Sequence, residues 1–276
     1  MSLTRPLTRS LTRALSHSEL TQKLGGGFSI FALNPYLLFD ARDSMIGTLE
    51  NPTLDLNPAL PETLDVITAT RAGTATFTDA NGNIATAPAN TVRVDHVDGV
   101  PMILVEPSAT NLVTYSEDFS QSAWSKNNVT LSSGFSAPDG SMNASKLEAN
   151  AADSSLQYTF TVTSGTTYSV SFYLKTISGS LETAIGLGSP GFPQNEGEGG
   201  RYKNITVTDE WQRFTLTSTA DANAATGISF GGFSSFSTGE EVYIWGAQLE
   251  TGSVATSLIP TSGGNAAART RAADNL

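Results

Sequence analysis

The sequence predicts an all-β protein whose main domain is an antiparallel β-sandwich of the jelly-roll type. First, residues 158–162, 168–175 and 211–217 alternate apolar and small polar side chains with a period of two. This alternation is typical of strands that have one buried and one solvated face. Second, turn-forming residues such as 163–165 and 178–180 separate these runs. Several short strands in series form antiparallel sandwiches rather than βαβ units.

Residues 1–27 are predicted to form a basic attachment arm that orders, with a short helix, when it docks on a larger assembly. Leucine and arginine recur there with a period of four, and the residues expected to make the attachment are Leu3, Arg5, Leu7, Arg9, Leu11 and Arg13. In a helix this period keeps the leucines in one slowly drifting stripe. A frayed basic terminus and a mitochondrial type of transit peptide are the alternative interpretations. Three glycines at positions 25–27 follow as a hinge.

Residues 28–110 are predicted to be an extended docking region with two β-hairpins. Prolines at positions 35, 52, 58 and 61 disfavour helix in its first part. Asn81-Gly82 lies between two alternating runs and predicts the first hairpin, because both residues tolerate positive φ. A calcium loop is the competing interpretation of this stretch, but its glycine does not have the EF-hand spacing.

A second hairpin is predicted over residues 92–106, with its turn at Asp98-Gly99. His96 lies beside Asp95 in the first strand of this hairpin. No matching nucleophile accompanies the pair, so we interpret His96 as a surface residue rather than as part of a catalytic site.

The charge distribution argues against a nucleic-acid partner. The net charge is −11, with 26 acidic and 15 basic side chains. Residues 1–23 carry +3, so the remainder carries −14. Phosphate backbones require concentrated lysine and arginine. A basic arm on an acidic body instead indicates that the two parts meet different surfaces.

The composition excludes several kinds of site because the residue types that they need are absent or rare. The chain has no cysteine and two histidines, so neither a disulfide framework nor a thiolate metal site is available. No apolar run reaches about 18 residues, so no membrane span is expected.

Four stretches resemble a module of bacteriophage virion proteins. They are the hairpin at 70–82, the segment 106–124, the closing segment 244–261, which begins Ile244-Trp245-Gly246-Ala247-Gln248-Leu249-Glu250, and Thr270-Arg271-Ala272-Ala273-Asp274. The family resembled is that of phage tail-fibre and minor structural proteins, whose module is similar to carbohydrate-binding jelly rolls. The resemblance covers about residues 65–276. It implies a jelly-roll sandwich over residues 111–262 and a C-terminal tail over residues 263–276.

This resemblance implies a non-enzymatic structural protein located in the virion. We expect a tail-fibre or receptor-binding protein that contacts other virion proteins through its N-terminal region and presents the sandwich to host surface glycans. We also expect a homo-oligomer, with a trimer as the favoured form. A capsid decoration or head fibre protein without a host-binding role is the alternative. A more remote alternative is a polysaccharide hydrolase with Glu196 and Glu198 as its carboxylate pair. No cofactor is expected, although a structural calcium ion on Glu117 and Asp118 stays open.

Sugar binding by such modules uses exposed aromatic faces with polar side chains around them. Trp124, Trp211 and Trp245 are expected in the core, because large rings at strand positions are usually buried. Tyr173 lies on the opposite face of its strand from the core residues and is the predicted platform. The loop 186–202 is long, which is typical of functional or mobile loops. Its predicted recognition residues are Phe192, Gln194, Asn195, Glu196, Arg201 and Tyr202.

Overall fold

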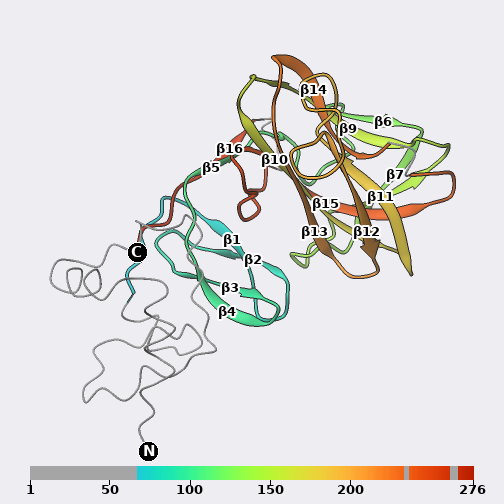
Figure 1. Cartoon of the computed structure of the whole chain (residues 1–276). Helices are drawn as coiled ribbons and strands as arrows, with labels where there is room; N and C mark the ends of the chain where they lie inside the picture. The colour runs from blue at the N-terminus through green and yellow to red at the C-terminus, as the bar shows by residue number, and fades with distance from the viewer. Residues whose placement is uncertain (1–66, 233–235, 262–266) are drawn as a thin grey trace, which may run out of the picture.

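The computed structural model describes residues 67–232, 236–261 and 267–276 (Figure 1). Within these ranges the regular elements are all β-strands, and every pair of named strands is antiparallel. The predicted fold class is therefore confirmed for this part of the chain. The basic arm with its six attachment residues (Leu3, Arg5, Leu7, Arg9, Leu11 and Arg13) and the docking region before residue 67 lie outside the described residues.

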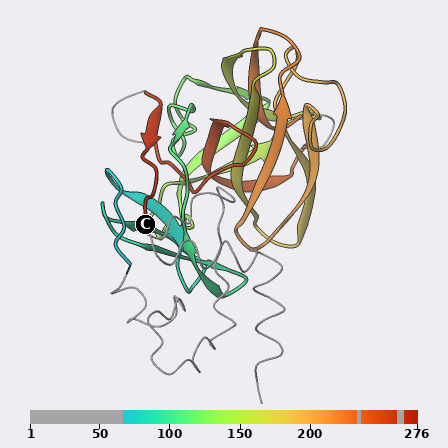
Figure 2. The same ribbon diagram turned by 60° about the vertical axis from the view of Figure 1, so that its left-hand side comes forward.

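Two five-stranded sheets form the sandwich (Figures 1 and 2). The first contains β7 (Val129–Phe135), β8 (Ala144–Ala149), β10 (Thr167–Thr176), β13 (Gln212–Thr219) and β15 (Glu241–Thr251), in the order β13-β10-β15-β8-β7. The second contains β6 (Trp124–Asn127), β9 (Ser155–Val162), β11 (Ser180–Gly186), β12 (Tyr202–Thr208) and β14 (Ala224–Gly231), in the order β12-β11-β14-β9-β6. The chain crosses repeatedly from one sheet to the other, as in jelly rolls.

The main core lies between these sheets, and the period-two alternation builds it. In β10, the side chains of Val170, Phe172 and Leu174 point inward and are fully buried. Leu156 of β9 and Phe230 of β14 belong to the same cluster from the opposite sheet. Burying one such side chain contributes roughly 1.5–3 kcal/mol. The alternation read from the sequence is thus the pattern that divides core from surface.

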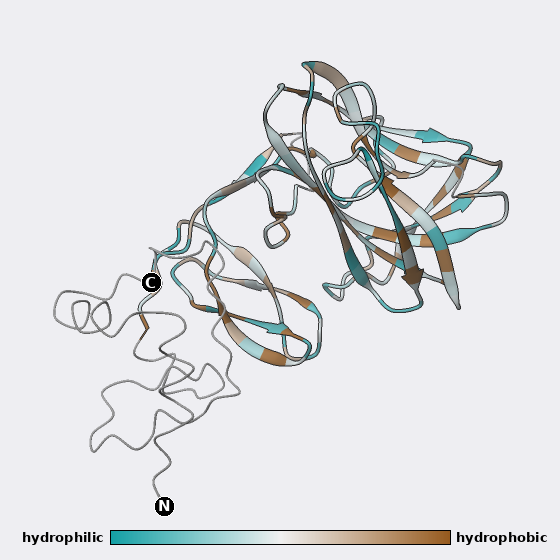
Figure 3. Cartoon of the chain, in the orientation of Figure 1, coloured by the Kyte–Doolittle hydropathy of each residue, from teal (hydrophilic) through white to brown (hydrophobic). Residues whose placement is uncertain are grey.

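Two hairpins precede the sandwich. β1 (Ala75–Thr78) pairs with β2 (Ile84–Ala87), and β3 (Arg93–Val97) pairs with β4 (Val100–Leu104). Both predicted hairpins are therefore confirmed. Hydrophilic and hydrophobic stretches alternate along these strands, as they do in the sandwich (Figure 3).

The two hairpin turns differ in kind. In the second, Asp98 and Gly99 both have positive φ, 52° and 76°, as a tight two-residue turn requires. In the first, Gly82 has a φ of 80°, but Asn81 is not among the residues with positive φ. Only one of the two residues that tolerate positive φ therefore adopts it in this turn. Instead, the Asp79 carboxylate accepts hydrogen bonds from the backbone N–H groups of Asn81 and Asn83 at 2.8 and 2.9 Å, which caps a longer loop.

The hairpins dock on the outer face of the first sheet (Figures 1 and 2). A second, smaller apolar cluster forms at this junction, made of Ala137, Ala144, Tyr173, Trp245 and Leu258, with Ile84, Phe135 and Trp211 packed against it. The Ile84 N–H also donates to the Pro138 carbonyl at 2.9 Å. Side chains on the outer face of the first sheet are consequently buried where the hairpins cover them.

The last strand runs back along the hairpin region. β16 (Arg269–Arg271) pairs with β5 (Ala109–Asn111). Beyond it, Thr70 and Asn275 form a β-bridge, with N···O distances of 2.7 and 3.0 Å. The segment interpreted from the sequence as a C-terminal tail is thus bound, from Arg269 onward, to residues far earlier in the chain.

Candidate functional site

A groove of about 660 Å³ opens between the turn of the first hairpin and the outer face of the first sheet. Its volume falls within the roughly 300–1,000 Å³ that is usual for ligand sites. Its walls come from separate elements: residues 81–83 on the hairpin side, and residues 135–138, Lys175, Glu210, Trp211 and Tyr243 on the sandwich side. These residues combine large rings with charged groups, so the groove is the candidate ligand site.

Three half-buried rings line this groove in a row. The Tyr243 ring lies between the other two, with centroid distances of 5.0 Å to Phe135 and 6.5 Å to Trp211. In β15, Val242 and Ile244 point into the main core, and the alternation therefore directs Tyr243 outward. Phe135 ends β7, and Trp211 immediately precedes β13. The sheet thus carries an aromatic strip at the edge of the docked hairpins.

The three tryptophans divide into two kinds. The indole N–H of Trp124 donates to the Tyr115 carbonyl at 2.9 Å, and that of Trp245 donates to Asn143 Oδ1 at 2.7 Å. Both rings are buried, as predicted. Trp211 is half-buried, and its indole N–H has no partner among the described residues. The expectation that Trp211 belongs to the core is corrected: it stands just before its strand begins, at the groove.

Two charged groups at the groove also lack a partner among the described residues. Within the described ranges, the ammonium of Lys175 and the carboxylate of Glu210 form no hydrogen bond or ion pair. Lys175 lies opposite Tyr243 in the pairing of β10 with β15. The groove therefore offers a donor and an acceptor next to ring faces, which is the chemistry that a polyhydroxylated ligand with apolar C–H faces needs.

Tyr173 does not belong to this open site. Its side chain points away from the main core, as predicted, but it is only 9% exposed because the second apolar cluster covers it. It packs edge to face against Trp245 at 5.4 Å, and the guanidinium of Arg213 lies 5.4 Å from its ring centroid. Burial raises the pKa of its hydroxyl. The expectation of an exposed platform at Tyr173 is therefore wrong.

The long loop before β12 is tied down rather than open. Phe192 is 1% exposed and packs against Tyr168 in the main core, so its predicted exposure is also wrong. Glu198 accepts hydrogen bonds from Lys203 Nζ at 2.8 Å and from the Thr217 N–H at 2.9 Å. Asn204 donates to Glu196 at 2.7 Å. Both carboxylates thus accept hydrogen bonds that hold the loop in place. This structural role gives no support to their being the carboxylate pair of a hydrolase.

The other predicted loop residues lie together, away from Tyr173. Gln194 and Asn195 are exposed, and Gln194 donates to Ser189 Oγ at 2.9 Å. The Arg201 guanidinium lies 6.0 Å from the ring centroid of Tyr202, and both side chains are half-buried. Gln194, Asn195, Arg201 and Tyr202 therefore stay a second, smaller set of predicted contact residues.

The described residues contain no group of three or more histidine, cysteine, aspartate or glutamate side chains that would hold a metal ion. Asp118, one of the two residues considered for calcium, accepts hydrogen bonds from Ser120 and Gln121 and caps a turn. In the same ranges no helix is long and apolar enough to cross a membrane.

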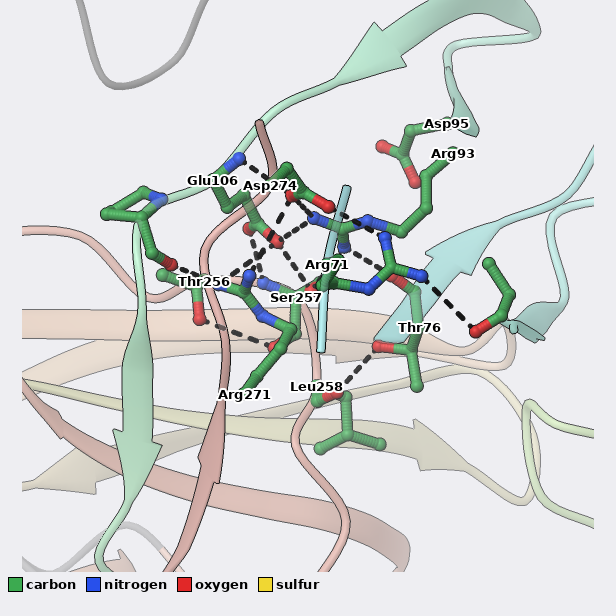
Figure 4. A network of polar contacts seen from close by, with 12 residues as sticks. Arg71, Thr76, Arg93, Asp95, Glu106, Thr256, Ser257, Leu258, Arg271 and Asp274 are labelled. Carbon is green, nitrogen blue, oxygen red and sulfur yellow. Dashed lines mark hydrogen bonds and ion pairs between the residues drawn. The ribbon is translucent and has the colours of Figure 1, made fainter. Parts of the chain in front are cut away.

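A buried charge network joins the segments at the base of the hairpins (Figure 4). Arg71 Nη1 donates to Asp274 Oδ1 at 2.7 Å, and Arg93 pairs with the other oxygen of the same carboxylate. Arg93 Nη2 also lies 2.8 Å from Glu106, which Arg271 approaches at 3.4 Å. The charged side chains are 0–4% exposed. Buried charges of this kind are retained only when they are paired.

Attraction within this network outweighs the cost of burial for its acids. Burial acts to raise the pKa of Glu106, but Arg271, Arg93 and two hydrogen bonds from Ser257 hold that pKa below its usual value. Burial also acts to raise the pKa of Asp274, and Arg93 and Arg71 again lower it. Both carboxylates are therefore charged acceptors at neutral pH. Sequence reasoning missed the network, although Arg71, Glu106, Arg271 and Asp274 all lie in the stretches that resemble the phage module.

Comparison with known proteins finds only distant structural similarity. No protein-family model and no curated protein matches the sequence. The CBM22-1 xylan-binding domain from Paenibacillus barcinonensis matches over 53% of this chain and 94% of that domain, with 9% identity and a TM-score of 0.39. The family 11 carbohydrate-binding module from Clostridium thermocellum matches over 52% and 95%, with 10% identity and a TM-score of 0.34. Tailspike protein 4 of bacteriophage CBA120 matches over 51% of this chain but 21% of that one, with 17% identity and a TM-score of 0.36. TM-scores and identities this low assign the chain neither a family nor a ligand, and the description of the β-sandwich rests on its own two sheets.

Proposed function

We propose that this protein is a non-enzymatic structural component of a bacteriophage particle, of the tail-fibre or receptor-binding type, which binds host surface oligosaccharides in the groove. The observation that carries the binding role is the row of rings formed by Phe135, Tyr243 and Trp211. The ammonium of Lys175 and the carboxylate of Glu210 line the same groove and have no partner among the described residues. Sugar rings present C–H faces that stack on aromatic rings, and their hydroxyl groups pair with charged donors and acceptors. The groove provides both in one place.

The virion role rests on the sequence. The stretches at 70–82, 106–124, 244–261 and 270–274 resemble the module of phage tail-fibre and minor structural proteins. On this proposal the N-terminal region attaches to other virion proteins, the chain forms a homo-oligomer, and the sandwich faces the host. Quantitative mass spectrometry of purified particles tests the assignment. A handful of copies supports a tail location, hundreds of copies support head decoration, and absence from the particle overturns the virion role.

Binding is tested with arrays of bacterial O-antigen and capsular oligosaccharides, in neutral and acidic sets. Trp211→Ala and Tyr243→Ala, each in the full chain, are expected to weaken binding by about tenfold or more, because each removes one stacking face. Tyr202→Ala is the matched aromatic variant in the loop. If Tyr202→Ala abolishes binding and Trp211→Ala does not, the site is the loop, and the groove proposal fails. Binding of no oligosaccharide by the unaltered protein also contradicts it.

A further inference from the structure

The groove is composite, because its two walls belong to parts of the fold that share no β-ladder. The wall at residues 81–83 belongs to the first hairpin, and Lys175, Trp211 and Tyr243 belong to the sandwich. Among the strands that the structure describes, none of β1–β4 pairs with a strand of either five-stranded sheet. The width of the groove therefore depends on how firmly the hairpins are held to the sandwich.

Direct contacts between the hairpins and the sandwich side of the groove are few. Thr76 Oγ1 donates to the Leu258 carbonyl at 2.6 Å, and the Ile84 N–H donates to the Pro138 carbonyl at 2.9 Å. The apolar cluster around Tyr173 adds the half-buried side chain of Ile84. A hydrogen bond of 2.8 Å from Arg93 Nη1 to Ser257 Oγ adds a contact from β3. Ion pairs then reinforce the position of β3 and of the segment before β1.

The Asp274 carboxylate holds both of these segments. Its two oxygens bind Arg71, which precedes β1, and Arg93 of β3. The backbone N–H of Glu106, in the segment that leads into the sandwich, donates to Asp274 Oδ2 at 2.9 Å. Asp274 in turn donates its own N–H to the Glu106 carbonyl at 2.9 Å. The Asp274 side chain thus joins the segments of both hairpins to Glu106. Ser257, in the segment after β15, donates to the Glu106 carboxylate from its N–H at 2.7 Å and from its Oγ at 2.6 Å, which links the hairpins to the sandwich.

We propose that Asp274 is a positioning residue for the groove: it sets the distance between the hairpin wall and the aromatic wall without touching the ligand. The side chains of Arg71 and Arg93 are 0% exposed, so removal of the carboxylate takes from Arg71 the only acidic partner that the described residues give it and leaves Arg93 with Glu106 alone. The least costly response is for the hairpins to move off the sheet and hydrate these arginines. Such movement opens the groove and separates groups that a ligand must meet together.

The inference rests on the proposed oligosaccharide site, but its first test needs no ligand. The sequence has no cysteine, so Ala80→Cys in the first hairpin loop and Ser132→Cys in β7 give one pair of spin labels, both at exposed positions. Electron paramagnetic resonance then measures the distance between hairpin and sandwich in the full chain. We expect one narrow distribution, and a broadened distribution with longer distances after Asp274→Asn. Glu198→Gln, which neutralises an acid in the loop before β12, is the matched control and is expected to leave this distance unchanged.

The second test uses the oligosaccharide arrays. Asp274→Asn is expected to weaken binding by about tenfold or more, and Asp274→Glu to restore part of it, because a carboxylate returns to the two arginines. If Asp274→Asn prevents folding, Ser257→Ala decides, since it removes a milder link between Arg93 and Glu106. An unchanged distance distribution in whichever of these variants folds overturns the inference. A broadened distribution in a protein that binds no oligosaccharide supports the positioning role and contradicts the proposed function alone.

Discussion

Asp274 accepts a hydrogen bond at 2.7 Å from Arg71, a residue 203 positions earlier in the chain. The same carboxylate binds Arg93, and all three charged side chains are buried. The relationship joins an arginine before the first hairpin to an aspartate after the last strand. They form one contact that closes the described part of the chain on itself.

Acid is expected to loosen the hairpins before it unfolds the sandwich. The pKa values of Glu106 and Asp274 lie below their usual values of 4.5 and 3.8. The unfolded or undocked form therefore binds more protons in this range, so the stability that these groups add is present above those usual values and is lost as the pH falls through the lower, folded-state pKa values. The spin-label distance between residues 80 and 132 should broaden below about pH 4. A distance that stays narrow at pH 2 would contradict the prediction.

Asn111→Ala is expected to be among the most destabilising substitutions of a polar side chain. The buried amide of Asn111 donates to the carbonyls of Ala247 and Ile259 at 3.2 and 3.0 Å. It also accepts from the N–H groups of Val113 and Leu249 at 3.0 and 3.1 Å. Alanine leaves four buried backbone groups without this partner, which should cost about 3 kcal/mol or more. Urea unfolding measures the loss of free energy of unfolding. A change within the roughly 0.5 kcal/mol of a neutral surface substitution would argue against this account.

Gly246→Ala is expected to destabilise the sandwich more than Gly239→Ala. Gly246 has a φ of 60°, and a Cβ atom there would lie 2.9 Å from Tyr173 Cδ2. Gly239 has a φ of 85°, but nothing lies within 4 Å of a Cβ atom at that position. Backbone strain alone costs on the order of 1–3 kcal/mol, and Gly246→Ala adds a clash in the second apolar cluster. Equal melting temperatures for the two variants would show that the second apolar cluster accommodates the added Cβ atom without loss of stability.

Phe192→Ala is expected to lower the free energy of unfolding far more than Gln194→Ala, although both residues lie in the long loop. Phe192 is in the main core, so its truncation should cost about 3–5 kcal/mol. Gln194 is exposed, and its truncation should stay within about 0.5 kcal/mol. Guanidinium unfolding of both variants measures these values. A small loss for Phe192→Ala would mean that the loop is not anchored through this ring.

The sandwich could be predicted from the sequence because the alternation within a strand is a local property. It determines which side chains share a face, and Val170, Phe172 and Leu174 lie where the pattern predicts. What covers the other face is not local. Tyr173 points outward as expected, yet the hairpins and Leu258 bury it. Alternation alone contains no information about that cover.

The candidate site was missed for a related reason. Trp211 lies just before β13, where the strand pattern no longer decides which way a ring points. The groove also needs the turn at residues 81–83, which is more than 100 positions away from Trp211 in the chain. Long-range pairing of this kind is set by tertiary packing, and the charged network that fixes it has partners too distant for any local spacing rule.

The bridge between Thr70 and Asn275 has a practical consequence. Residues 70 and 275 are hydrogen-bonded neighbours, so the unit between them has its two ends side by side. Such a unit can be grafted into a surface loop of an unrelated carrier with short joints and little distortion of either partner.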